Sequence, residues 1–403
     1  MTFPADKPVI IAVGLYVPGT GFTRVLKELF TRLAHHYSIH WLGIAYRGYI
    51  KTTSHYTLYP SNLAGGDMYG AEEAATMALE LNAAAIWLLN DMYMLKNYRV
   101  AWQTLKEKNI QLIAYVPLDG DITDETTIAN SLFFDQLVLY TQWAEDEVGN
   151  AIKKYSQKNS VTNTPALNHI YHGVDTTFFT PATSANKARL KEIIFKMPGA
   201  AQTIFILNAN RYSERKDIDT TLLAFSNALP FFKRPAYLCL HMPGTDNVWL
   251  TEIYSKIERA GLKEKVILNP LGNDYVTNEE LRNLYRACDI GLNTSLGEGW
   301  GLISFEHAAC GAAQLVPGHT APAEVWKDAG IIVSKSHPVQ LPTSPFQMYR
   351  LDDKEIEQQL VKLVNDEAQL AQVSENCCRH AAGNQFNWDN IALQWKNFFQ
   401  TRG

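Results

Sequence analysis

The chain has 403 residues, of which 46% are hydrophobic and 19% charged, and its formal net charge is −5. This length exceeds one ordinary hydrophobic core and predicts two domains of about 200 residues each. The negative charge excludes a general basic field that would attract nucleic acid. No stretch approaches the roughly 20 apolar residues that cross a bilayer, and the apolar run 9–13 is too short for a signal peptide. We therefore expect a soluble, cytoplasmic protein that does not bind nucleic acid.

Strand-like and helix-like patterns alternate along the whole chain, which is typical of parallel sheets covered by helices on both faces. In the first half we expect strands at 9–13, 39–44, 84–89, 111–116 and 137–140, and helices at 23–35, 72–81 and 98–108. In the second half we expect strands at 203–207, 236–241, 266–268, 290–293, 314–316 and 331–333. The predicted class is α/β with two doubly wound sheets, joined near 174–181.

A basic loop follows the predicted strand 203–207 and reads Asn208-Ala-Asn-Arg-Tyr-Ser-Glu-Arg-Lys-Asp217. The carboxyl ends of parallel strands are where α/β sheets bind ligands. Arg211 can bind two phosphate oxygens through its forked guanidinium, and Lys216 adds a compact positive charge. The alternative is that Arg215 and Lys216 are solvated loop charges.

A glycine-rich segment, Ser295-Leu-Gly-Glu-Gly-Trp-Gly301, precedes a predicted helix 302–310 that ends at Gly311. The free N–H groups and the dipole of such a helix start favour a phosphate. Glu306 lies about one turn into the helix, where its carboxylate could accept two hydrogen bonds from a ribose diol. Glu298 lies in the loop, close to whatever the phosphate carries. The alternative is an ordinary βα turn in which Glu306 only balances the helix dipole.

These motifs resemble the family-4 retaining glycosyltransferases of the GT-B fold, a group that includes glycogen-synthase-like and mannosyltransferase-like members. Glu298 and Glu306 match the paired-glutamate motif of the family, and residues 210–216 are similar to its arginine-then-lysine loop. Residues 171–181 resemble its interdomain segment, and residues 14–24 resemble the first βα loop of its acceptor domain. The resemblance covers most of the chain.

The resemblance implies two Rossmann-like domains that face a cleft. Residues 1–175 would form the acceptor-side domain and residues 176–385 the nucleotide-sugar domain, while the terminal helix in 386–403 would pack back on the first domain. The implied activity is retaining transfer of a hexose from a nucleotide-diphosphate sugar of the UDP or GDP type. The acceptor would be a hydroxyl of a carbohydrate, a lipid-linked glycan or a protein. Neither a metal nor another cofactor is implied.

The resemblance also implies roles for individual residues. Arg211 and Lys216 would neutralise the departing diphosphate, Glu298 would hold the donor sugar, and Glu306 would hold the ribose. Backbone groups would complete the donor site. Those of Asn269, Pro270 and Leu271 would contact the base. Those that would contact the diphosphate belong to Gly19, Gly21, Gly299, Trp300, Gly301 and Leu302.

The first half departs from the family pattern after the strand 111–116. Family members often carry a His there, whereas this chain reads Pro117-Leu-Asp-Gly-Asp121. Asp119 is our candidate for the polar residue that would contact the donor sugar or the acceptor hydroxyl and act in catalysis. One alternative is a simple Asp-Gly turn. Another is a metal-binding pair of Asp119 and Asp121, which the GT-B fold does not normally need.

Other function classes stay open at this point. The chain could be a nucleotide-sugar-binding protein without transfer activity, or a GT-B epimerase of nucleotide sugars. A nicotinamide dehydrogenase is disfavoured, because no Gly-x-Gly-x-x-Gly follows the first strand of either half. The amphipathic basic helix within 24–36 has either a solvated face or a weak contact with an anionic membrane surface.

Overall fold

The computed structural model describes residues 7–61, 65–274 and 276–401, so residues 1–6 and 402–403 of the predicted terminal segments lie outside the described residues. The chain forms two compact units. The first unit comprises Met1–Leu118, Ile122–Gly173 and Trp388–Gly403, and the second comprises Asp119–Asp121 and Val174–Asn387. The chain thus passes between the units after Gly173 and after Asn387, and it also passes briefly into the second unit at Asp119–Asp121.

The first unit is built on an eight-stranded sheet of order β3-β4-β2-β1-β5-β6-β8-β9. Neighbouring strands are parallel except β3 and β4, which are antiparallel. The strand order reverses direction between β1 and β5. The strands are β1 (Val9–Leu15), β2 (Ser38–Ile44), β3 (Lys51–Thr52), β4 (Thr57–Pro60), β5 (Ala85–Leu89), β6 (Gln111–Val116), β8 (Gln136–Leu139) and β9 (Ala166–His169). The helices are α1 (Gly21–Leu33), α2 (Ala71–Glu80), α3 (Glu125–Ser131), α4 (Gln142–Asn159) and α13 (Trp388–Gln400).

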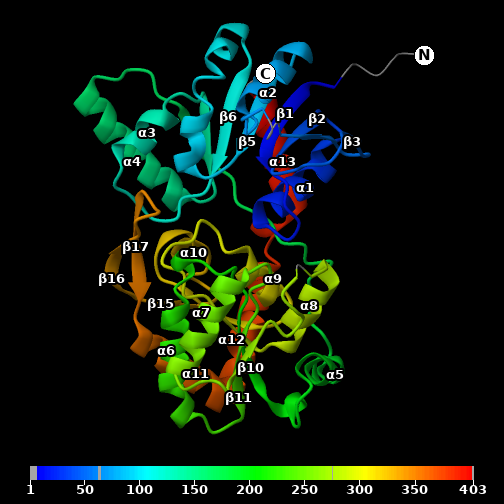
Figure 1. Cartoon of the computed structure of the whole chain (residues 1–403), viewed down its shortest axis with the longest axis vertical. Coiled ribbons are helices and arrows are strands. Elements are labelled where there is room, and N and C mark those ends of the chain that lie inside the picture. Colours follow the sequence, from blue (N-terminus) through cyan, green and yellow to red (C-terminus); the bar gives the residue numbers. More distant parts are fainter. Residues whose placement is uncertain (1–6, 62–64, 275, 402–403) are drawn as a thin grey trace. The chain divides into compact units, whose positions relative to one another are not determined.

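The last helix, α13, packs in the first unit although it follows the whole second unit in sequence. Figure 1 shows it in red beside the blue α1 and β1. Its Trp395 is completely buried, and the ring lies 4.4 Å from that of Trp87 and 4.8 Å from that of Tyr115. Large aromatic rings bury much apolar surface, which anchors the end of the chain to this sheet.

The second unit is built on a six-stranded, fully parallel sheet of order β12-β11-β10-β13-β14-β15. Its core contains completely buried apolar side chains such as Ile206, Leu238 and Leu315, as expected for strands covered on both faces. The strands are β10 (Ile204–Asn208), β11 (Ala236–Leu240), β12 (Val266–Leu268), β13 (Ile290–Leu292), β14 (Ala313–Pro317) and β15 (Ile331–Val333). The helices are α5 (Ser184–Phe195), α6 (Ile218–Ala228), α7 (Asn247–Arg259), α8 (Asn278–Ala287), α9 (Leu302–Ala309), α10 (Thr320–Val325), α11 (Asp353–Asn365) and α12 (Glu367–Ala381).

The predicted strands are confirmed to within a residue or two at their ends, but the predicted helix 98–108 is wrong. That region forms turns and the 3₁₀ helix η2 (Gln103–Lys108), which follows η1 (Met92–Asn97). Tyr98 and Trp102 are completely buried with their rings 4.7 Å apart, and the Trp102 indole donates to the Ala71 carbonyl at 2.8 Å. These fixed positions favour tight 3₁₀ turns over a regular α-helix.

A hairpin of β16 (Lys335–Gln340) and β17 (Phe346–Leu351) was not predicted. Most of β16 is polar and exposed, so it lacks the apolar alternation by which strands are recognised. None of the helices in the described part of the chain combines the length and apolar character needed to span a bilayer.

Four histidines are almost completely buried, namely His172, His241, His307 and His319. Burial lowers the pKa of His172 and His307 to about 3, and that of His241 and His319 to about 4. Below about pH 6.5 the unfolded chain therefore takes up protons that the folded chain does not. Folding stability must fall as the pH drops from 6.5 toward these values.

We predict that His172→Asn reduces this pH dependence. Each buried neutral histidine contributes about 1.4 kcal/mol of lost stability per pH unit in the window between its folded and unfolded pKa values. The slope of unfolding free energy against pH should therefore be shallower by about that amount in the variant. Urea denaturation at pH 6, 5 and 4 measures it, and a slope equal to that of the wild type would contradict the assignment.

Candidate active site

The strand order of the second sheet brings two loops together. β10 and β13 are neighbours at the point where the order reverses, which is where α/β sheets bind ligands. Residues 209–217, the basic loop, follow β10, and residues 293–301, the glycine-rich loop, follow β13. The Leu296 N–H donates to the Arg215 carbonyl at 2.8 Å. The loops that the sequence singled out therefore converge at one edge of the sheet.

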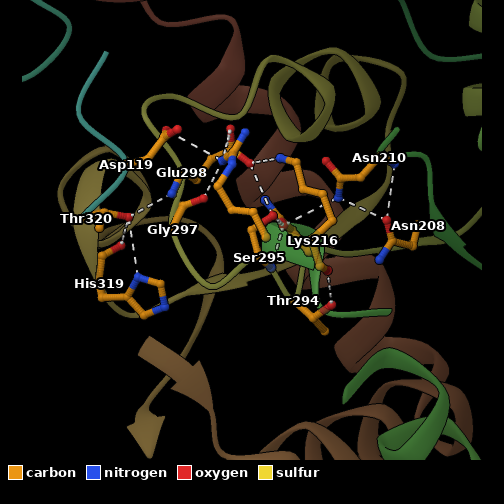
Figure 2. A network of polar contacts seen from close by, with 12 residues as sticks. Asp119, Asn208, Asn210, Lys216, Thr294, Ser295, Gly297, Glu298, His319 and Thr320 are labelled. Carbon is orange, nitrogen blue, oxygen red and sulfur yellow. Dashed lines mark hydrogen bonds and ion pairs between the residues drawn. The ribbon is translucent and has the colours of Figure 1, made fainter. Parts of the chain in front are cut away.

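An ion pair between Lys216 and Glu298 joins these loops. The Lys216 ammonium donates to Glu298 Oε2, and Figure 2 shows the two side chains pointing toward each other. Their side chains are only 10% and 12% exposed. An ammonium has three N–H donors, and among the described residues Glu298 is the only acceptor that Lys216 bonds. Lys216 thus retains donor capacity for an anionic ligand.

Arg215 adds a second cation to the same cluster. Its guanidinium donates to the Gly297 carbonyl and lies 3.5 Å from Asp119 Oδ1 and 3.9 Å from Glu298 Oε1. The interpretation of Lys216 as a solvated loop charge is therefore wrong, because Lys216 is buried and bonded to Glu298. The Arg215 side chain is 28% exposed, but its contacts with Gly297, Asp119 and Glu298 direct it into the cluster. Arg211 is exposed on the same loop, outside the cluster of contacts made by the described residues.

Burial and charge act in opposite directions on the ionisable groups of the cluster. Burial raises the pKa of Asp119 above its usual value, although Arg215 opposes the rise. Burial lowers the pKa of Lys216, and Glu298 opposes that fall. Burial would also raise the pKa of Glu298, but Lys216 and Arg215 outweigh burial and lower it. Burial thus disfavours the charged form of Lys216, so an additional anion beside it would be favourable.

Buried hydroxyl and amide groups form hydrogen bonds around the two residues of the ion pair. Ser295 Oγ lies 2.7 Å from Asn293 Oδ1 and 3.2 Å from Glu298 Oε2. Thr294 Oγ1 lies 2.6 Å from Thr221 Oγ1 and 3.2 Å from the Lys216 carbonyl. Such linked, buried groups rigidify a site. The sequence shows these residues only as polar loop positions, so their roles were missed.

The glycine-rich loop turns into α9 as predicted. Gly301 has φ +92° and directly precedes Leu302, the first residue of the helix, and Gly311 has φ +92° just after its end. The prediction of a helix stopped by Gly311 is confirmed. Trp300 is 3% exposed and its ring stacks on Phe305 at 5.1 Å, so the ring belongs to the packed interior and is not exposed to a ligand. Glu306 is 2% exposed in α9, where Tyr285 donates to its carboxylate at 3.4 Å.

Asp119 lies against the glycine-rich loop. A Cβ atom added at Gly297 would come within 1.7 Å of the Asp119 carbonyl oxygen, so only glycine fits there. Asp121 begins the short strand β7 (Asp121–Ile122). The structure thus places the Asp119 carboxylate beside Arg215 rather than in an isolated turn. In the described ranges, no group of three or more His, Cys, Asp or Glu side chains could hold a metal ion.

The remaining predicted residues lie elsewhere on the two units. Asn269, Pro270 and Leu271 follow β12 at the same carboxyl edge, and Asn269 Oδ1 accepts the Met242 N–H at 2.6 Å. In the first unit, Gly19 has φ +78° in the loop after β1, and Gly21 is the first residue of α1. Their backbone amides thus lie at the start of a helix.

No family model matches the sequence. A serotype-specific mannosyltransferase from Escherichia coli, WbdA, is 27% identical over 190 residues, which are 47% of this chain and 20% of that protein. The chain therefore spans about a fifth of the length of this curated relative.

Solved structures resemble the chain over almost its whole length. HepE from Anabaena, in complex with UDP and glucose, gives a TM-score of 0.69 at 13% identity, covering 98% of this chain and 100% of that one. A sucrose-phosphate synthase from Thermosynechococcus elongatus gives 0.72 at 16% identity, covering 98% and 99%. An α,α-trehalose 6-phosphate synthase from Burkholderia multivorans gives 0.72 at 11% identity, covering 98% and 99%. The expected fold class is confirmed: the chain has the α/β GT-B fold and resembles group 1 glycosyltransferases.

We predict that Gly297→Ala disrupts the candidate site. The new methyl group would meet the Asp119 carbonyl at 1.7 Å, so the backbone of one segment must shift. Overpacking of this kind costs about 1–3 kcal/mol, which urea denaturation would measure. The control is Gly149→Ala in α4, where a Cβ meets only the end of the Leu167 side chain at 3.3 Å. The control should be neutral or slightly stabilising, and equal effects in both variants would contradict the close approach at Gly297.

Proposed function

We propose that the chain is a retaining glycosyltransferase of the family-4 type, which transfers a hexose from a nucleotide-diphosphate sugar to an acceptor hydroxyl. The acceptor is a carbohydrate, a lipid-linked glycan or a protein. The observation that carries the proposal is the cluster of Arg215, Lys216 and Glu298 at the β10/β13 edge, in which Lys216 and Glu298 are largely buried. In support, WbdA is by name a mannosyltransferase, and HepE was solved with UDP-glucose.

The donor would lie along the carboxyl edge of the second sheet. Its diphosphate would meet Lys216, the exposed Arg211 and the free N–H groups at the start of α9. Its base would meet the backbone of 269–271 after β12, which is two strands from β10 in the sheet order. Two strand spacings amount to about 10 Å, a separation that a ribose and a phosphate can bridge. Glu306 would hold the ribose hydroxyls.

Donor binding would rearrange the ion pair. Lys216 would turn part of its donor capacity to the diphosphate, and Glu298 would then accept hydrogen bonds from the sugar hydroxyls. As the bond between the anomeric carbon and the phosphate oxygen breaks, negative charge grows on the diphosphate and the cations stabilise it. Since Arg215 and Lys216 already supply positive charge, we propose that the reaction needs no metal.

Retention would follow from attack on the same face as the leaving group. The acceptor oxygen bonds to the anomeric carbon, and its proton passes to the departing phosphate oxygen. A protein nucleophile is then unnecessary. Asp119, held beside Arg215 and Glu298, is our candidate for a group that contacts the donor sugar or the acceptor hydroxyl.

A panel of UDP- and GDP-hexoses tests the proposal. We expect at least one to raise the melting temperature, because a ligand that binds only the folded state stabilises it. With that donor and a mixture of glycan acceptors, nucleoside diphosphate should be released only when acceptor is present, and NMR of the product should show a retained anomeric configuration. Binding without release would favour a non-transferring binding protein, and conversion of the donor sugar without acceptor would favour an epimerase.

We predict that Lys216→Ala lowers turnover by about 100-fold or more, since it removes a donor that stabilises the leaving diphosphate. The matched control is Lys263→Ala, which removes an exposed lysine of the same unit. Steady-state release of nucleoside diphosphate measures both variants. Wild-type turnover in Lys216→Ala would remove the basic loop from the reaction.

We predict opposite effects of Glu298→Gln on binding and on turnover. In the empty site Glu298 competes with a diphosphate for Lys216, so loss of its charge should tighten nucleoside diphosphate binding by about tenfold, or ~1.4 kcal/mol. Turnover should nevertheless fall by about 100-fold, because the donor sugar loses its partner. Calorimetry with UDP and GDP, with the exposed Glu264→Gln as control, measures the affinity. Weaker binding would show that Glu298 does not compete for Lys216.

A further inference from the structure

The β16–β17 hairpin covers the candidate site from one side. It follows β15 but leaves the parallel sheet, and its strands pair antiparallel with each other. The outer strand β16 is mostly exposed, whereas β17 buries Phe346, Met348 and Leu351. In the same three-stranded sheet, β17 is also the neighbour of β7. β17 is thus the inner strand of the hairpin and packs on the chain around the candidate site.

The inner strand contacts the glycine-rich loop. The backbone N–H of Tyr349 donates to the Leu296 carbonyl at 2.9 Å. A Cβ atom at Gly297 would lie 3.3 Å from Met348 Cγ, so the loop passes directly beside β17. Leu296 and Gly297 immediately precede Glu298, which carries the ion pair with Lys216.

The same strand contacts the segment Asp119–Asp121. The Tyr349 hydroxyl donates to Asp121 Oδ2. A Cβ atom at Gly120 would come within 2.4 Å of the Gln347 carbonyl oxygen, so this backbone also approaches β17 closely. Asp119 at the start of the segment lies 3.5 Å from Arg215.

Tyr349 is therefore bonded to the glycine-rich loop through its backbone N–H and to the segment Asp119–Asp121 through its hydroxyl. Its ring is itself held in place, with Lys335 Nζ 3.9 Å from the centroid and the His319 ring 5.8 Å away. His319 directly precedes Thr320, whose hydroxyl accepts the Glu298 N–H at 3.3 Å. The strand that carries Tyr349 is further tied to the basic loop, because Arg350 pairs with the buried Asp217 at 2.9 Å.

We propose that Tyr349 is a positioning residue for the transfer reaction. Through its hydroxyl bond to Asp121, it holds the Asp119 segment in register with the glycine-rich loop, so that Asp119 and Glu298 approach Arg215 together. The inference rests on the proposed function. It assigns to the hairpin a role that neither the paired-glutamate motif nor the basic loop contains.

The test uses variants that change one atom or one group. Tyr349→Phe keeps the ring and the backbone bond to Leu296 but removes the hydroxyl. We expect its kcat to fall by about 10-fold or more, because a small misplacement of catalytic groups is costly, while its affinity for the nucleoside diphosphate changes less than twofold. Asp121→Ala should behave in the same way, and the double variant should be no worse than either single one, since both remove the same bond. Asp121→Asn retains an oxygen acceptor and should restore most of the turnover.

Tyr237→Phe is the matched control. Tyr237 lies on β11 of the same unit, away from the candidate site, and Lys265 Nζ lies 4.7 Å from the centroid of its ring. Like Tyr349, it is therefore a tyrosine with a lysine ammonium over its ring. Its loss of a hydroxyl should leave kcat unchanged. Wild-type kcat in Tyr349→Phe, or additive losses in the double variant, would overturn the proposal.

Hydrogen exchange separates failure of this inference from failure of the proposed function. In Tyr349→Phe the backbone amides of 119–121 and 295–299 should exchange faster than in the wild type, whereas those of the β11 region should not. Unchanged exchange in both segments would overturn the positioning role whatever the activity. If the wild type turned over no donor of the panel while exchange still increased in Tyr349→Phe, the proposed transfer function would be wrong. Tyr349 would then be only a structural link between the segments 119–121 and 295–299.

Discussion

The ion pair between Lys216 and Glu298 is the interaction on which the candidate site depends. It joins the loops of two adjacent strands, and each partner would lose its nearest opposite charge in a poorly solvated place without the other. An ion pair of this kind contributes little net stability, because the cost of desolvation consumes most of the attraction. The ion pair instead contributes to specificity, because it fixes a cation and a carboxylate at one edge of the sheet. There each of them can form a new bond with a charged ligand.

The sheet topology explains why the pair forms at all. Parallel strands direct all their carboxyl ends to one edge, and the reversal of strand order between β10 and β13 sends the following chain to opposite faces of the sheet. The loops after these strands must then meet before their helices begin. Hydroxyl and amide groups at 293–295 fill the space beneath them and satisfy the buried backbone.

Glycine has a particular function at 297, where a backbone carbonyl occupies the space of a side chain. This close approach brings Asp119 to the cluster, although Asp119 follows a strand of the other sheet in the chain. Strand β17 of the hairpin then contacts both the glycine-rich loop and the segment Asp119–Asp121. The cluster is therefore assembled from three separate stretches of sequence, namely the basic loop, the glycine-rich loop and the segment Asp119–Asp121, and β17 contacts the last two.

Much of the fold could be predicted from the sequence, for a local reason. Buried parallel strands are runs of apolar residues, so the strands at 111–116, 266–268 and 331–333 were recognised with the bounds that the structure has. Gly301 and Gly311 marked the ends of α9, because left-handed backbone favours glycine. The helix prediction for 98–108 was wrong for the opposite reason, since the tertiary packing of Tyr98 and Trp102 determines the backbone conformation there.

The sequence by itself determined which residue types were available: a basic loop after one strand and a carboxylate in a glycine-rich turn after another. Only the tertiary structure decided which of those charges meet. Arg211 and Arg215 are both basic loop residues, yet Arg215 is directed at Asp119 and Glu298 while Arg211 is exposed. Asp121 and Tyr349 are distant in sequence and carry no motif, so their contact could not be foreseen. Side-chain direction and long-range pairing depend on how the strands pack, and one sequence alone does not encode that geometry in any local pattern.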